Sequence, residues 1–327
     1  MNPAKLWLVI LALLAAPDAR AAGFRTFEIP AEGGKPAISG AMWYPCAEPS
    51  GKIELKGITI DGAKDCPIKG SRLPLVVFSH GNLGAFYDHY DTAQALADAG
   101  FVVAAITHRG DNLPTLADAA DPSVMFERPH AITRLIDFML TESPAALVID
   151  ADRIGFFGFS AGASTGLMLA GAVPDWSAML CRFSPSPLAC KDTLQNDFRL
   201  QRHPPEARIK AAVLADPGMW SDTESIAAIR IPIQLWQSEY GGRGLPNIAV
   251  APERVAAIER HLHEPHEYHV VPLAGHFAFM LCGPSISPIP QYCADGSGFD
   301  RAAFHQDFNK QVIRFLQSHL GRRGDRS

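Results

Sequence analysis

The stretch that decides the fold is Phe156-Phe157-Gly158-Phe159-Ser160-Ala161-Gly162-Ala163, whose centre has the form G-x-S-x-G. An apolar segment precedes it and an Ala/Gly-rich helical segment follows. Ser160 is therefore expected at a sharp turn between a strand and a helix. Side chains two positions before and after the serine would crowd such a turn, so glycine is needed at both. The turn holds the serine oxygen at a helix N-terminus, where negative charge is favoured. The pattern predicts a nucleophilic serine.

Segments typical of strands and of helices alternate on both sides of Ser160. We expect strands at 24–29, 38–44, 75–79, 101–107, 153–157, 211–215, 231–236 and 268–272, the first two as an antiparallel pair. We expect helices at 86–99, 129–140 (opened by Pro129), 161–172, 252–261 and 304–320. This order predicts an α/β fold with a mostly parallel central sheet and helices on both faces. A site is expected at the carboxyl ends of the strands.

The first residues have the pattern of a secretory signal peptide. Lys5 precedes an apolar run at 6–16, and Ala19-Arg20-Ala21 fits a small-x-small cleavage site. The run is too short to span a membrane as a helix. We therefore expect a signal peptide at 1–21, secretion or transfer to the periplasm, and no stable membrane insertion after cleavage.

The remaining chain is expected to form a single domain at 22–320, followed by a disordered tail at 321–327. Residues 46–72 form an excursion rich in Gly, Lys and Pro, and 108–127 are irregular and acidic. Residues 173–209 are too long for an ordinary connection, which predicts an insertion or partial lid after the nucleophile helix. The formal net charge is −5, and the sequence contains no basic patch, so no nucleic-acid partner is expected.

All six cysteines lie after the leader, and an even number in an exported chain implies disulfide bonds. Their grouping favours three local pairs: Cys46–Cys66, Cys181–Cys190 and Cys282–Cys293. Free buried thiols are the other interpretation. Four histidines lie close together, but no helix or strand period directs three of them to one point, so no metal site is predicted; they are His261, His263, His266 and His269.

A nucleophilic serine needs a base and an acid that orients the base, in the chain order Ser, Asp/Glu, His for this kind of turn. His276 follows a strand directly, in Leu273-Ala274-Gly275-His276-Phe277, and is the expected base. Two acids are candidates. Asp216 follows the strand at 211–215, and Glu239 follows the strand at 231–236. The residues themselves favour Asp216, because the turn Pro217-Gly218 would fix its carboxylate, but leave Glu239 open.

Donors for an oxyanion should come from the residue after the nucleophile and from a loop after an earlier strand. Ala161 is the first expected donor. The second is the N–H of Asn82 in the loop Ser79-His80-Gly81-Asn82-Leu83-Gly84. Its glycines let the backbone approach a substrate. Each such donor typically stabilises the transition state by about 3 kcal/mol.

The chain resembles bacterial predicted dienelactone hydrolases related to the platelet-activating-factor acetylhydrolases, over most of residues 73–280. The matching segments are Phe78-Ser79-His80-Gly81, His108-Arg109-Gly110-Asp111, Glu127-Arg128-Pro129, the turn at Ser160, Ala215-Asp216-Pro217, Ser238-Glu239-Tyr240 and Ala274-Gly275-His276-Phe277. The resemblance implies the α/β-hydrolase fold. It also implies that the acid is Asp216, with Glu239 fixing a loop. The chain departs from true dienelactone hydrolases, whose nucleophile is a cysteine, and its insertion separates Ser160 from Asp216 more widely than in acetylhydrolases.

These residues predict an exported serine esterase that hydrolyses short-chain acyl esters through an acyl-enzyme, without a cofactor. The expected partner is a small ester, held by an apolar pocket that includes Phe159, Trp220 and Phe277, although core packing accounts for Phe277 equally well. One alternative keeps the triad for a polyester, a lipid or acyl transfer to an alcohol. Another is a non-catalytic binding module on the same fold.

Overall fold

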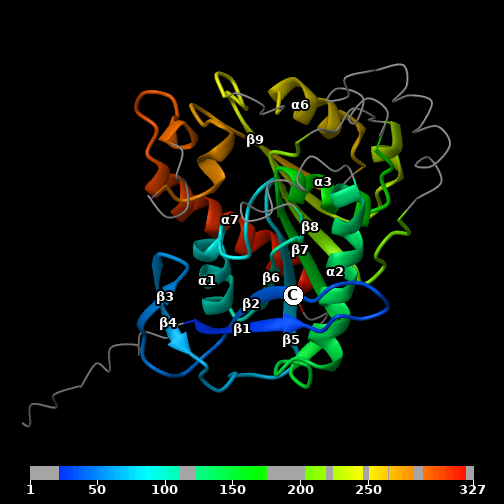
Figure 1. The fold of residues 1–327 in the computed structure, drawn as a ribbon. Coiled ribbons are helices and arrows are strands. Elements are labelled where there is room, and N and C mark those ends of the chain that lie inside the picture. Colours follow the sequence, from blue (N-terminus) through cyan, green and yellow to red (C-terminus); the bar gives the residue numbers. More distant parts are fainter. Residues whose placement is uncertain are drawn as a thin grey trace, which may run out of the picture.

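The computed structural model describes residues 22–110, 123–174, 203–218, 224–245, 250–263, 265–282 and 290–321. Within these ranges a sheet has the order β10-β9-β8-β7-β5-β6-β2-β1-β4-β3 (Figure 1). The strands are β1 Gly23–Ile29, β2 Ile38–Tyr44, β3 Gly51–Leu55, β4 Ile58–Lys64, β5 Leu73–Ser79, β6 Val102–Ile106, β7 Ile149–Phe159, β8 Ile209–Ala215, β9 Ile233–Ser238 and β10 His266–Val271. The neighbours from β10 to β6 pair in parallel, and β1 and β2 form the expected antiparallel pair.

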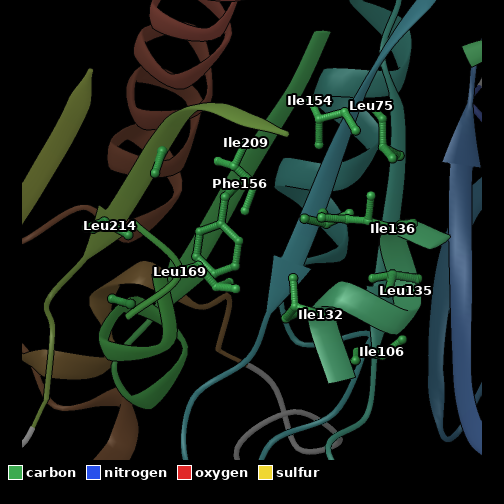
Figure 2. Close-up of a cluster of buried hydrophobic side chains, with 14 of the residues drawn as sticks. Leu75, Ile106, Ile132, Leu135, Ile136, Ile154, Phe156, Leu169, Ile209 and Leu214 are labelled. Atoms are coloured by element: carbon green, nitrogen blue, oxygen red, sulfur yellow. The ribbon is translucent and has the colours of Figure 1, made fainter. Parts of the chain in front are cut away.

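Helices cover both faces of the sheet. They are α1 Tyr90–Asp98, α2 Ser123–Thr141, α3 Ala161–Leu169, α6 Pro252–His261 and α7 Arg301–Leu320. Successive residues of each central strand enter different cores, since side chains alternate across a sheet. Leu75 and Phe156 pack with α2 and α3 in one core (Figure 2). Val76 and Phe157 pack with α1 and α7 in the other. This is the α/β architecture that the alternation of segments predicts.

Two expectations about individual segments were wrong. The 46–72 excursion contains the β3–β4 hairpin, whose strands bury alternate residues and whose turn residues Lys56 and Gly57 both have positive φ. The second helix begins at Ser123, so Pro129 lies inside α2 instead of opening it. A proline is tolerated best in the first helical turn. Here the preceding turn is held by the burial of Met125 and Phe126, which outweighs that preference.

Two of the expected disulfide bonds are formed, Cys46–Cys66 and Cys282–Cys293. The first joins the segments that follow β2 and β4. The pair Cys181–Cys190 lies outside the described residues, as do most of the expected insertion at 173–209, the leader at 1–21 and nearly all of the tail at 321–327. Of the helices in the described ranges, none combines the length and the apolar composition needed to cross a membrane.

Candidate active site

Ser160 lies between the end of β7 and the start of α3, in the backbone conformation that the sequence pattern requires. Its φ is 53° and its ψ is −116°. Conformations of this kind cost of order 1–3 kcal/mol and persist only where the surroundings enforce them. The Ser160 N–H donates to the carbonyl of Ala215 on the neighbouring strand (2.9 Å), and the Ser160 carbonyl accepts from the N–H of Ser164 (3.0 Å). These bonds hold the turn from both sides.

The two glycines of the G-x-S-x-G pattern are required by space. A Cβ at position 158 would overlap the carbonyl of Gly162. A Cβ at position 162 would overlap the carbonyl of Ser79 at the end of β5. The second contact brings the loop after β5 close to the serine.

Ser160, His276 and Asp216 form one hydrogen-bonded series. The Oγ of Ser160 lies 2.9 Å from Nε2 of His276, and Nδ1 of His276 lies 2.7 Å from Oδ2 of Asp216. All three residues are buried. A proton on Nδ1 satisfies the carboxylate and leaves the Nε2 lone pair to accept the serine proton. The segments after β7, β8 and β10 therefore supply one hydrogen-bonded Ser–His–Asp series at the carboxyl edge of the sheet.

The two candidate acids occupy different positions. The Asp216 carboxylate also accepts hydrogen bonds from the N–H and the Oγ–H of Ser238, at 3.0 and 2.6 Å. Glu239 is exposed, and its Oε2 accepts from the N–H of Leu273 at 2.6 Å. The structure thus brings Asp216 to His276, and Glu239 to the loop that carries His276. Ser238 is a site residue that the sequence analysis missed, although it stands at a strand end beside Glu239.

The expected apolar pocket is only partly visible. Phe159 is 1% exposed, and its ring stacks on the imidazole of His276 with centroids 4.8 Å apart. The Phe159 ring thus packs against one face of the His276 imidazole. Phe277 is half-buried and stacks on Tyr292 at 4.0 Å. Trp220 lies outside the described residues.

A cleft of about 370 Å³ opens beside His276. Its lining residues are Tyr240, Gly241, Arg243, Gly244, Leu245, Gly275, His276, Phe277, Gln291, Tyr292, Ala294 and Asp295. The aromatic residues Tyr240, Phe277 and Tyr292 lie in this lining. The cleft therefore offers apolar side chains beside His276, whose Nε2 faces the Oγ of Ser160.

The residues after β5 are here called the β5 loop (80–89). This loop contains Asn82, one of the two expected oxyanion donors. A Cβ at Gly81 would lie 3.5 Å from the Cβ of Ser160, so this backbone approaches the serine closely. Asn82 follows at the surface. Ala161 is the first residue of α3, and the first N–H groups of a helix have no partner within the helix. The structure thus places Ala161 directly after Ser160 at the start of α3, and Asn82 directly after Gly81, whose backbone approaches Ser160.

The β5 loop is held by buried polar groups that the sequence analysis did not assign. Arg128 of α2 is 1% exposed and donates to the carbonyls of His80 and Gly81, at 2.7 and 3.1 Å. Asp88 accepts from the N–H of Ala85 at 2.9 Å. Burial raises the pKa of the Asp88 carboxyl to about 7, against the opposing effect of that hydrogen bond. The only sequence signal for Arg128 is the segment Glu127-Arg128-Pro129.

The residues after β10, here called the β10 loop (272–282), are also held through their carbonyls. Arg301 of α7 donates from Nη1 to the carbonyls of Phe277 and Met280, at 2.9 and 3.0 Å, and pairs with Asp295 at 2.6 Å. The Nε2 of His305 contacts the carbonyl of Ala278 at 2.9 Å. Helix α7 thus fixes the loop that carries His276.

No metal centre is found in the part of the chain that the structure describes, where His, Cys, Asp and Glu nowhere gather in threes with a geometry for a metal ion. Of the four clustered histidines, His269 stacks on Trp236 and His261 contacts the carbonyl of Ala257 through Nδ1. These contacts are those of ordinary helix and strand residues.

The strand order, with a serine at a strand–helix turn and its hydrogen-bond partners at later strand ends, is that of the α/β-hydrolase fold. Residues 52–122 match the family model described as platelet-activating factor acetylhydrolase, isoform II. That segment includes the β5 loop and ends before Ser160. The chain therefore has the α/β-hydrolase fold and a segment similar to the platelet-activating factor acetylhydrolases.

A solved structure supports the same fold assignment. The chain is similar to a ferulic acid esterase from Streptomyces cinnamoneus, with 18% identity and a TM-score of 0.64, over 95% of this chain and 93% of that one. At this identity the likeness concerns the fold. Among curated protein sequences none matches this chain.

Proposed function

We propose that this protein is an exported serine esterase that hydrolyses short-chain acyl esters through an acyl-enzyme. The observation that carries the proposal is the series Ser160 Oγ, His276 Nε2 and Asp216, with separations of 2.9 and 2.7 Å. Such a series supplies the nucleophile, the base and the orienting acid that acyl transfer by a serine uses. The esterase named among similar structures and the acetylhydrolase family model agree with this class of reaction.

In the first half-reaction His276 accepts the Ser160 proton at Nε2 while Oγ attacks the ester carbonyl. The carbonyl π electrons move to the oxygen, and the N–H groups of Asn82 and Ala161 are proposed to bind that oxyanion. The tetrahedral intermediate collapses, the C–O bond to the alcohol breaks, and His276 returns the proton to the alcohol. Asp216 holds the imidazole in the tautomer that this needs and stabilises the imidazolium.

In the second half-reaction water takes the place of the serine hydroxyl. His276 removes a proton from the water, the resulting hydroxide attacks the acyl carbon, and Ser160 leaves with the proton from His276. The products are a carboxylic acid and the free enzyme. The apolar cleft beside His276, with Phe277 in its lining, suits a small ester.

The nucleophile is tested by Ser160→Ala, with Ser318→Ala on α7 as a matched serine control. The control serine donates only to the carbonyl of Phe315. We expect Ser160→Ala to lose about 10⁴-fold or more in kcat on p-nitrophenyl acetate and butyrate, and to lose labelling by a fluorophosphonate probe. Both properties should stay at wild-type level in the control. Esterase activity that survives in Ser160→Ala would refute the assignment.

Export is part of the proposal and has a separate support, the leader pattern at 1–21. Cleavage after Ala21 or Ala22 is expected. Mass spectrometry of the N-terminus of the exported protein tests this, and a retained Met1 would contradict it.

A further inference from the structure

One peptide group of the β5 loop links a buried guanidinium to the proposed oxyanion site. The carbonyl of Gly81 and the N–H of Asn82 belong to the same planar peptide. In a trans peptide these two groups point in opposite directions. Whatever fixes the carbonyl on one side therefore aims the N–H on the other.

The Gly81 carbonyl accepts from three donors. They are Nδ1 of His80 at 2.6 Å, Nη2 of Arg128 at 3.1 Å and the N–H of Gly84 at 3.3 Å. The second terminal nitrogen of the guanidinium, Nη1 of Arg128, donates to the preceding carbonyl of His80 at 2.7 Å. Two successive peptides are thus held by one rigid, planar fork.

The tautomer of His80 follows from its contacts. Its Nε2 accepts from the backbone N–H of His108 at 2.9 Å, so its proton is on Nδ1 and is donated to Gly81. The same fork reaches Ser79, whose Oγ accepts from Nη1 of Arg128 at 3.3 Å and lies 2.8 Å from Nε2 of His108. Burial, and then the positive charge of Arg128, lower the pKa of His108. The His108 ring is therefore neutral, and its Nε2 accepts a hydrogen bond from the Ser79 hydroxyl.

We propose that Arg128 is a positioning residue for the oxyanion site, acting through the peptide between Gly81 and Asn82. Its guanidinium fixes the plane of that peptide and polarises it, so that the Asn82 N–H is aimed and strengthened as a donor. The inference rests on the proposed esterase function. Its physical basis is that linked hydrogen bonds strengthen one another in a poorly solvated interior, and that oxyanion donors act only in a narrow geometry.

The expected kinetic signature is a loss in kcat with little change in KM. The oxyanion exists in the transition state and not in the bound ester, so a misaimed donor weakens only the former. Loss of a whole donor costs about 10²- to 10³-fold in kcat, and a misaimed one should cost roughly 10- to 100-fold.

The variants are Arg128→Met, which removes all donors, and Arg128→Lys, which keeps the charge without the fork. Arg134→Met is the matched control. Arg134 is on the same helix and donates to the carbonyls of Pro36 and Pro30, away from the β5 loop. Arg128 and Arg134 both line a cleft of about 400 Å³, through which we expect a small cation to reach the position that Arg128→Met vacates.

Three measurements are made on each variant: kcat and KM for p-nitrophenyl acetate, the affinity for a trifluoromethyl ketone that forms a tetrahedral adduct with serine, and the response to added methylguanidinium. For Arg128→Met we expect kcat to fall roughly 10- to 100-fold, KM to stay within about threefold, and ketone affinity to fall with kcat. Methylguanidinium should restore part of kcat. Arg128→Lys should lie between wild type and Arg128→Met, and Arg134→Met should match wild type.

The proposal is overturned if Arg128→Met keeps wild-type kcat, or if its loss in kcat leaves ketone affinity unchanged. If Arg128→Met does not fold, Arg128→Lys decides. Wild-type kcat and ketone affinity in that variant would show that the fork has no positioning role. Fluorophosphonate labelling of the wild-type enzyme separates the two hypotheses: absent labelling at Ser160 defeats the proposed function itself, whereas labelling with an unaffected Arg128→Met defeats only this inference.

Discussion

The β5 loop and the β10 loop follow strands on opposite sides of β7 in the sheet, and each is held by an arginine that donates to two of the loop's backbone carbonyls. Arg128 holds His80 and Gly81 in the first, and Arg301 holds Phe277 and Met280 in the second. The difference lies in what each loop is proposed to contribute. The β5 loop contributes its own backbone N–H, whereas the β10 loop contributes the side chain of His276.

This difference sets how much displacement each loop tolerates. A shift of the β10 loop can be absorbed by rotation of the His276 side chain, which is hydrogen-bonded independently to Asp216. The backbone N–H of His276 donates separately to the carbonyl of Gly241 at 2.8 Å. A backbone donor has no side-chain torsion with which to compensate. We therefore expect substitutions behind the β5 loop to reduce kcat more, for an equal loss of stability, than substitutions behind the β10 loop.

The largest expected effect removes the independent tie on the β10 side. Asp216→Asn presents an amide N–H to Nδ1 of His276 and favours the wrong tautomer, so kcat should fall about 10⁴-fold. Glu239→Gln is the control, since its amide oxygen still accepts from the Leu273 N–H; kcat should stay within about threefold. Steady-state kinetics on p-nitrophenyl butyrate measure both. A greater loss at Glu239 would make Glu239 the acid.

The turn at Ser160 and the position of His276 after a strand could be predicted from sequence because their signals are local. Gly158, Ser160 and Gly162 lie within five positions, and His276 follows a strand. The groups behind the loops could not. Arg128 contacts carbonyls 47 and 48 positions away, and a carbonyl has no residue-specific signature in a sequence. Only the packing of α2 against the end of β5 brings them together.

The helix boundaries show the same limit. The sequence places the start of α2 at Pro129, because local preference favours proline in a first turn. The structure extends the helix back to Ser123, and the added turn includes Arg128. Arg128, which donates to the carbonyls of the β5 loop, thus lies in the segment whose helical structure the local prediction missed.

The next effect tests whether the β5 loop responds to pH. Burial raises the pKa of Asp88 to about 7 from an ordinary value of 3.8, so between these values the folded state binds more protons than the unfolded state. Stability should therefore fall as pH rises from about 4 to about 7, by up to ~4 kcal/mol from this group. Asp88→Asn should lack this part of the slope.

Urea denaturation of wild type and Asp88→Asn across this pH range measures the difference. Asp307→Asn, at an exposed aspartate of α7, is the control and should keep the wild-type slope. Parallel stability curves for wild type and Asp88→Asn would show that Asp88 is not a protonated group in the folded state. The β5 loop would then lose its proposed sensitivity to pH, and the two loops would differ only in what they present to the substrate.

The smallest expected effect tests the comparison itself. Arg301→Met breaks the pair with Asp295, whose side chains are 12% and 9% exposed, and should cost about 3 kcal/mol of stability. Because Asp216 and Gly241 still hold His276, kcat at a temperature where the variant is folded should fall less than tenfold. Lys310→Met, at an exposed residue of the same helix, controls for loss of charge. Denaturation and kinetics together place Arg301→Met and Arg128→Met on one plot of kcat against stability. If Arg301→Met loses as much kcat per kcal/mol as Arg128→Met, the side chain of His276 gives the β10 loop no more tolerance than a backbone donor has, and the distinction between the two loops fails.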